Sequence, residues 1–179
     1  MRYELIPGVG VNKLHFGMSR EEMQQVDGKP KRLITYGTNT PIVKERRQNL
    51  DCAYLFDRAV EFMFFEDVPG TFKGILVYKN INFFQDENVI WKLADHDTPE
   101  MVCNDRYVMY PNLGILIGGF GKIPIFEGKN VILFAPERKN FWYSFMMENP
   151  YLKLEKAKEA KAKAEAEAQA KAEGQKAED

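Results

Sequence analysis

Residues able to carry acid–base or metal chemistry are few in this sequence. Histidine occurs only twice, at His15 and His96, and a hydrolase triad needs a histidine between a nucleophile and a carboxylate. The densest cluster is 95–97, Asp-His-Asp, which suggests a metal or acid–base site. Consecutive residues in a turn point in different directions, so we expect these side chains not to converge on one ion. We therefore predict no catalytic residue, no metal site and no cofactor.

Two other patterns partly match a catalytic carboxylate pair and a phosphate-binding loop. Glu61 with Glu66 or Asp67 could form a pair of carboxylates, but nothing nearby in the sequence would separate their pKa values, so surface charges are expected. The run GGFGK at 118–122 lacks the GxxxxGK[ST] spacing of a phosphate-binding loop. The sequence thus favours a protein that is not an enzyme.

Composition predicts one compact domain in a soluble, cytoplasmic protein. The chain has 179 residues, of which 45% are hydrophobic, enough to bury a core. Its net charge of −1 and its lack of an arginine-rich stripe argue against a nucleic-acid partner. No run approaches the roughly 18 apolar residues of a membrane span, and we see no signal peptide. Cys52 and Cys103 are widely spaced, which favours reduced thiols.

The stretch from Pro7 to Pro30 carries the clearest local signals. After a short apolar run and a glycine turn, Ser19 and Glu22 have the spacing of a capping box, in which each side chain satisfies a backbone N–H of the other residue. Met23 and Val26 then form a narrow apolar stripe. Gly28 can adopt the left-handed conformation that ends a helix, and a proline follows. A short helix docked on a sheet is expected here.

Within residues 14–30, the spelling FGMSREEM…DGKP resembles the signature of BamE-like domains. Such domains occur in the small lipoprotein of the outer-membrane β-barrel assembly machine, in β-lactamase-inhibitor protein, and in bacterial immunity proteins encoded beside toxins. The resemblance implies a helix followed by about three antiparallel strands, in a fold used to inhibit other proteins. The chain departs from the family at Asp27-Gly28, where Leu-Gly is usual, and it has no lipobox cysteine, unlike the lipoprotein branch.

Apolar runs after this helix predict antiparallel strands. Residues 52–56 and 59–65 flank the polar pair Asp57-Arg58 and should form a hairpin. Residues 73–78 should add a third strand beside 59–65.

A second set of predicted elements repeats the order of the first. Asp86 can cap a helix over 86–95, and strands are expected at 106–109, 113–118 and 131–135. We therefore predict an α+β fold with an antiparallel sheet, short helices on one side, and two tandem BamE-like units spanning 1–78 and 79–137.

The chain beyond residue 152 has a different composition. From Lys153 it consists of Lys, Glu and Ala with a few Gln, Gly and Asp residues, which are good helix formers without an apolar stripe. We predict a single domain over 1–152, followed by a tail over 153–179 that forms a long solvated helix or is disordered.

Function must be inferred from the missing chemistry and from the resemblance. Our leading hypothesis is a non-catalytic protein-binding module, an immunity protein that binds and blocks a cognate toxin. The alternatives are a module for small-ligand binding or assembly, and an enzyme whose site is scattered over strand ends. A toxin partner is expected under the first hypothesis alone.

Two groups of residues are candidates for partner binding, because interfaces draw most of their energy from a few aromatic and arginine anchors. Arg46 and Arg47 belong to the only basic cluster outside the tail, whose composition favours a solvated loop or edge, with contact to a phosphate or an acidic partner as the alternative. Phe141, Trp142 and Tyr143 form an aromatic run that could instead pack a terminal helix onto the sheet.

Overall fold

The computed structural model describes most of the chain: residues 1–35, 41–48, 50–66, 70–99, 101–103, 107–120, 128–149, 157–158 and 160–164. The chain divides into two compact units, Met1–Met147 and Glu148–Asp179. Every helix and strand labelled below lies in the first unit, apart from the last residue of β14. No helix in these described ranges is long and apolar enough to cross a membrane.

The smaller sheet has five strands in the order β3-β2-β1-β8-β9. Its one parallel pair joins β1, the first strand of the chain, to β8, with Tyr3 opposite Leu76. The other pairs are antiparallel. The strands are β1 (Arg2–Ile6), β2 (Gly10–Val11), β3 (Leu14–His15), β8 (Ile75–Tyr78) and β9 (Ile81–Asn82).

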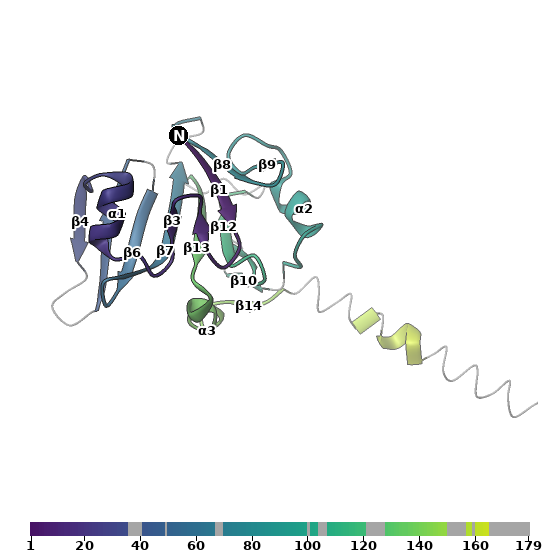
Figure 1. Cartoon of the computed structure of the whole chain (residues 1–179). Helices are drawn as coiled ribbons and strands as arrows, with labels where there is room; N and C mark the ends of the chain where they lie inside the picture. The colour runs from purple at the N-terminus through teal and green to yellow at the C-terminus, as the bar shows by residue number, and fades with distance from the viewer. Residues whose placement is uncertain are drawn as a thin grey trace, which may run out of the picture. The chain divides into compact units, whose positions relative to one another are not determined.

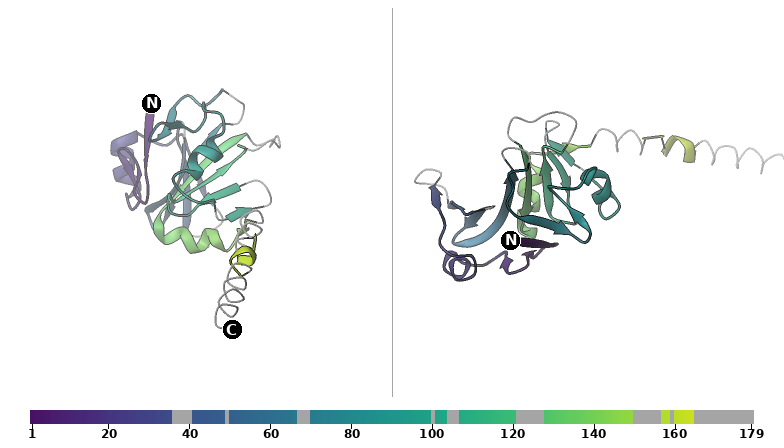
Figure 2. Two further views of the ribbon diagram at one scale, coloured as in Figure 1. Left: turned by 90° about the vertical axis from the view of Figure 1, so that its right-hand side faces the viewer. Right: turned by 90° about the horizontal axis from the view of Figure 1, so that it is seen from above.

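The larger sheet follows the order β14-β10-β11-β12-β13-β7-β6-β5-β4. Its central pairs are antiparallel, and β6 and β7 appear as long, bent strands (Figures 1 and 2). The strands are β4 (Arg32–Thr35), β5 (Ile42–Arg46), β6 (Leu50–Leu55), β7 (Arg58–Glu66), β10 (Met101–Cys103), β11 (Tyr107–Tyr110), β12 (Ile115–Gly118), β13 (Lys129–Phe134) and β14 (Met147–Glu148).

Strict alternation of side chains gives the larger sheet two different faces, as a strand period of two requires. On β7, Phe62 and Phe64 join the main core, whereas Met63 packs with a smaller cluster on the other face. On β13, Leu133 and Ile132 divide in the same way. The main core also takes side chains from β1, β2, β3, β8 and β9, so the smaller sheet covers one face of the larger sheet.

The helices of this unit are short: α1 (Arg20–Asp27), α2 (Val89–Ala94), the 3-10 helix η1 (Pro136–Arg138) and α3 (Lys139–Tyr143). Met23 of α1 and Val89 and Leu93 of α2 belong to the main core, on the face that carries the smaller sheet. Trp142 and Tyr143 of α3 pack against the smaller cluster on the opposite face. Helices therefore lie on both faces.

Helix α1 begins at the predicted capping box and ends at the predicted glycine, although Gly28 has a ψ of −175° and is therefore not in the left-handed conformation that the sequence predicts. The Ser19 hydroxyl accepts a hydrogen bond from the Glu22 N–H at 3.2 Å, and a Glu22 carboxylate oxygen accepts one from the Ser19 N–H at 2.7 Å. Gly28 ends the helix with a φ of 76°. The expected apolar stripe is only partly right, since Met23 is fully buried while Val26 is 44% exposed.

The predicted α+β class, with tandem helix-plus-strand units, is wrong because the fold is mostly β and built from two sheets. Strand β7 pairs with β6 and β13, whereas β8 pairs with β1 and β9 in the other sheet. Residues 59–65 and 73–78 are therefore not neighbours. The cause is β1, which alternates buried Tyr3 and Leu5 with exposed residues and pairs with β8. The sequence prediction had not included β1 as a strand.

Two local expectations also need correction. The predicted second helix exists as α2, but Asp86 does not cap it: Asn88 occupies the cap position in a left-handed conformation, and Asp86 binds Lys92 at 2.9 Å instead. In the tail, described helical residues are confined to 157–158 and 160–164, so no long helix is present among the described residues. An Ala-Lys-Glu segment has no apolar face whose packing would stabilise a longer one.

Candidate functional site

The second face of the larger sheet is exposed or half-buried across β4 and β5, whereas Asp51 and Ala53, its residues on β6, are buried. Register places Arg32, Arg46 and Asp51 side by side on three successive strands, and Ile34, Lys44 and Ala53 in the next row. These rows lie opposite the main core, which takes Leu50, Cys52 and Tyr54 from β6. We call this side of β4–β7 the open face, and its members are Arg32, Ile34, Ile42, Lys44, Arg46, Asp51, Ala53, Glu61, Met63 and Phe65.

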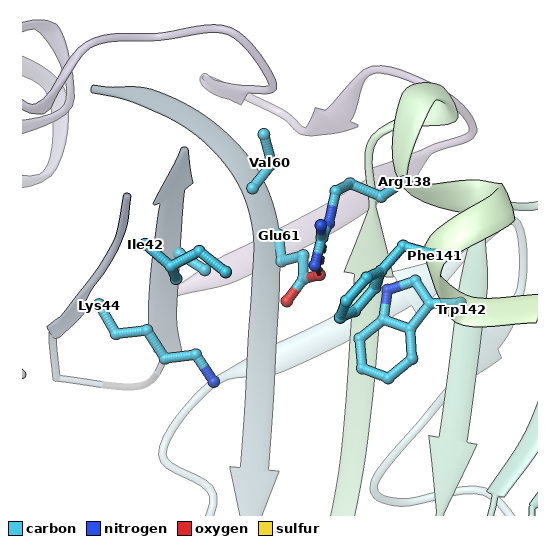
Figure 3. A pocket seen from close by; sticks show the side chains of 8 residues that line it. Ile42, Lys44, Val60, Glu61, Arg138, Phe141 and Trp142 are labelled. Carbon is cyan, nitrogen blue, oxygen red and sulfur yellow. Dashed lines mark hydrogen bonds and ion pairs between the residues drawn. The ribbon is translucent and has the colours of Figure 1, made fainter. Parts of the chain in front are cut away.

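At its β7 side the open face deepens into a cleft of about 300 Å³, whose other wall is α3 (Figure 3). Strand residues form the floor and one side, and the end of η1 with α3 forms the other. The lining side chains are Ile42, Lys44, Ala53, Val60, Glu61, Arg138, Phe141 and Trp142.

An ion pair between Glu61 and Arg138 crosses the cleft. Oε1 of Glu61 accepts a hydrogen bond from Nε of Arg138 at 3.1 Å and lies 3.1 Å from Nη2 of the same guanidinium. Burial raises the pKa of the Glu61 carboxyl above its ordinary value, and the positive charges of Arg138 and Lys44 counter this only in part. Because Glu61 is 8% exposed, its charge depends on those two cations.

Aromatic side chains complete the wall. The Arg138 guanidinium lies over the Phe141 ring, 3.5 Å from its centroid, and Phe141 contacts Trp142 edge to face at 5.5 Å. The Trp142 Nε1–H is buried and makes no hydrogen bond of ordinary length and angle, although its nearness to Glu61 helps to hold that pKa down. The wall of the cleft is therefore formed by two aromatic side chains and an arginine.

Of the predicted partner-binding residues, Phe141 and Trp142 line the cleft. Tyr143 lies beside them on α3, packs against the smaller cluster and has Lys139 Nζ 5.8 Å from its ring centroid. The interpretation that the aromatic run packs a helix onto the sheet is thus confirmed for Trp142 and Tyr143, and a role of the run in partner binding stays a prediction.

The two arginines predicted together are separated by the sheet. Arg46 lies on the open face, where it binds Asp51 at 2.8 and 2.9 Å and lies over the Phe65 ring. Arg47 was expected to be exposed, but it is only 3% exposed. It donates to Glu45 at 2.7 Å, to the Gly28 carbonyl at 2.7 Å and to Asp27 at 3.3 Å.

Arg47 therefore joins the end of α1 to β5 from the core side and is inaccessible to a partner. Its Nε–H is a buried donor that no described group accepts. The sequence pattern failed because consecutive strand residues face opposite sides, so Arg46 and Arg47 could not share one surface.

Asp97 and His96, from the Asp-His-Asp cluster at 95–97, contact different parts of the fold. Asp97 is buried and accepts hydrogen bonds from Asn112 N–H at 2.8 Å, from the Asn112 side-chain amide at 2.8 Å and from Leu113 N–H at 2.9 Å. His96 faces the Tyr78 ring and Lys79. Within the described ranges, no group of three or more His, Cys, Asp or Glu residues could hold a metal ion.

Three charged residues of the cleft were missed or misread from sequence. Glu61 was expected to be a surface charge, yet it is buried and paired with Arg138. One signal for Glu61 was available, a lone carboxylate within the apolar strand AVEFMFF. Lys44 had been read only as part of a polar loop, and nothing in the sequence marks Arg138 as its neighbour in space. Asp67 and part of the 118–122 run lie outside the described residues.

A comparison of the chain with protein-family models, with curated proteins and with solved structures finds no match.

Proposed function

We propose that this chain is a non-catalytic protein-binding module that docks an acidic partner protein on the open face and its cleft. The observation that carries the proposal is the open face itself, where cationic and apolar side chains alternate next to an aromatic wall. Sheet faces are normally covered on the core side and polar on the solvent side. This one instead leaves Ile34, Ile42 and Phe65 only partly buried among charged groups.

Charge favours an acidic partner. The open face and the cleft wall together carry four basic and two acidic side chains: Arg32, Lys44, Arg46 and Arg138 against Asp51 and Glu61. An excess of positive charge on one patch of a chain with net charge −1 attracts and orients a complementary negative surface.

The cleft fits a side chain of such a partner. Its volume lies at the lower end of the roughly 300–1,000 Å³ typical of small-molecule pockets, and it has Trp142 and Phe141 on one wall. Buried aromatic and arginine groups are where interfaces concentrate their energy. The cleft holds a single carboxylate, already paired with Arg138, and no histidine lines it, which supports a binding role without catalysis.

The narrower form of the proposal is that the partner is a toxin and the chain is its immunity protein. It rests on the resemblance of residues 14–30 to BamE-like domains, whose capping box is formed here by Ser19 and Glu22. The family implies inhibition of another protein by a non-catalytic domain.

Affinity capture from the source cells with a charge-reversed pair of variants tests the proposal. The double variant Arg32→Glu, Lys44→Glu should recover at least about tenfold less of a stoichiometric protein than the native chain, because it places negative charge opposite an acidic partner. A tenfold loss corresponds to about 1.4 kcal/mol of binding free energy. The matched control is Lys29→Glu, Lys73→Glu, which reverses two exposed charges away from the open face. Thermal unfolding of all three proteins verifies that they are folded.

Equal recovery with the two double variants would contradict the proposal, as would the absence of any stoichiometric protein. Trp142→Ala gives a second check, because it removes the aromatic wall without changing charge. If the partner so recovered lacks toxic activity in cells that do not express this chain, the narrower immunity proposal fails while the binding proposal stands.

A further inference from the structure

The tip of the β6–β7 hairpin displays an aromatic ring. The chain reverses at Phe56 and Asp57, which have φ angles of 48° and 61°, so the turn lies one residue earlier than the Asp57-Arg58 turn predicted from sequence. Both residues are in the left-handed region, which suits Gly and Asn in this kind of hairpin turn. A phenylalanine there is strained.

Phe56 is also the most exposed large apolar side chain among the described residues, at 78%. The strained backbone and the exposed ring are both unfavourable for the folded chain. Such outliers are concentrated at functional positions.

Contacts around the tip hold it firmly against the loop before α1. Asp57 binds Arg20 at 2.7 Å, and Arg58 donates to the Gly17 carbonyl at 3.0 Å. Backbone bonds of 2.8 Å join Gly17 N–H to the Ala59 carbonyl and Ala59 N–H to the Met18 carbonyl. The ring is thus presented on a braced turn, and little conformational freedom would be lost on binding.

We propose that Phe56 is an aromatic anchor that inserts into an apolar pocket of the partner protein, with an acidic rim around that pocket facing Arg20 and Arg58. This inference rests on the proposed function and deepens it. Leu55, which precedes the ring, pairs with Ile42 of β5, and Ile42 lines the cleft. The ring therefore lies one residue beyond a strand pair that includes a residue of the cleft.

A photocrosslinking amino acid, p-benzoylphenylalanine, placed at position 56 tests the contact in the source cells. Position 91 is the matched control, because Trp91 is also a surface aromatic, 73% exposed, on α2. We expect an adduct with the captured partner from position 56 and none from position 91. No adduct from position 56, with the partner still recovered by affinity capture, would overturn the assignment of the anchor and leave the proposed function intact.

Two substitutions separate the ring from the strain. Phe56→Ala and Phe56→Asn both remove the ring, so both should lower partner recovery at least about tenfold. Phe56→Tyr keeps an aromatic ring and should recover the partner as the native chain does. Only asparagine suits the left-handed turn, so Phe56→Asn should melt about 2–4 °C above Phe56→Ala. Equal melting temperatures would refute the strain, and unchanged recovery with both variants would refute the anchor.

A membrane surface is the rival ligand for an exposed ring flanked by arginines. Co-sedimentation with phosphatidylcholine vesicles containing phosphatidylserine separates the two. We expect equal, low sedimentation of the native chain and of Phe56→Ala; sedimentation that is several-fold greater for the native chain would overturn the protein-pocket assignment. If partner recovery falls with the Phe56 variants but not with Arg32→Glu, Lys44→Glu, the proposed role of the open face is refuted, while the assignment of Phe56 as an anchor stands.

Discussion

At the scale of single residues, burial decides which charges are available to a partner. Arg46 and Arg47 are adjacent in sequence, but the first is exposed beside Asp51 and the second is buried beside Glu45. Residue type and spacing predicted a basic cluster and could not assign its members to faces, because the register of β5 depends on β4 and β6. The same limit hid Glu61, whose partner Arg138 lies 77 positions away.

Replacing Arg47 should lower the free energy of unfolding much more than replacing Arg46. Arg47→Ala leaves the buried Glu45 and the largely buried Asp27 without their cation, and breaking a buried ion pair in this way costs about 3–5 kcal/mol. Arg46→Ala removes a pair whose arginine is 46% exposed and should cost about 1 kcal/mol or less. Urea unfolding of the two variants checks this contrast; similar losses would mean that the Arg47 network is weakly coupled.

Glu61 should give the unfolding free energy a measurable pH dependence. Its pKa is raised in the folded protein above the ordinary value of 4.5, so the folded state binds the proton more tightly than the unfolded state. As pH falls from neutrality through the raised pKa towards 4.5, the native chain should therefore gain stability relative to Glu61→Gln. Urea unfolding at a series of pH values measures the difference, and a difference that is constant with pH would contradict the raised pKa.

At the scale of elements, local signals were readable and pairing was not. The Ser19–Glu22 cap, the Gly28 exit and the strands at β11, β12 and β13 follow from neighbours in sequence. The parallel pairing of β1 with β8 joins segments far apart in the chain, and the hydrophobic periodicity of each segment does not predict which strand it pairs with. The turn at Phe56 was misplaced because Asp57 suits either position of a two-residue turn, and the braces to Arg20 and Gly17 are tertiary contacts.

The N-terminal cap of α1 should contribute measurably to the free energy of unfolding. Ser19→Ala removes the acceptor for the Glu22 N–H and should lower the free energy of unfolding by about 1 kcal/mol. Ser19→Asp keeps an acceptor at the same place and should lose little. Chemical unfolding compares the two variants; an equal loss in both would show that the hydroxyl has another role.

At the scale of the whole first unit, the two sheets explain why one face is free. The smaller sheet with α1 and α2 covers one side of the larger sheet, and α3 covers only part of the other. The side that remains open holds Arg32, Lys44 and Arg46 and ends at the cleft under Trp142. Sequence reasoning named Phe141, Trp142 and Tyr143 as candidates, and two of these line the cleft. It could not predict the surface itself, which arises from a sheet whose strand order was unknown.

Hydrogen–deuterium exchange of the chain, free and bound to its captured partner, tests the central claim most directly. If the open face is the interface, amide exchange should slow on binding in β4, β5, the β6–β7 hairpin tip and α3, while α2 and β9 exchange as in the free chain. Slowed exchange confined to α2 and to the strands of the smaller sheet would place the partner elsewhere and contradict the claim.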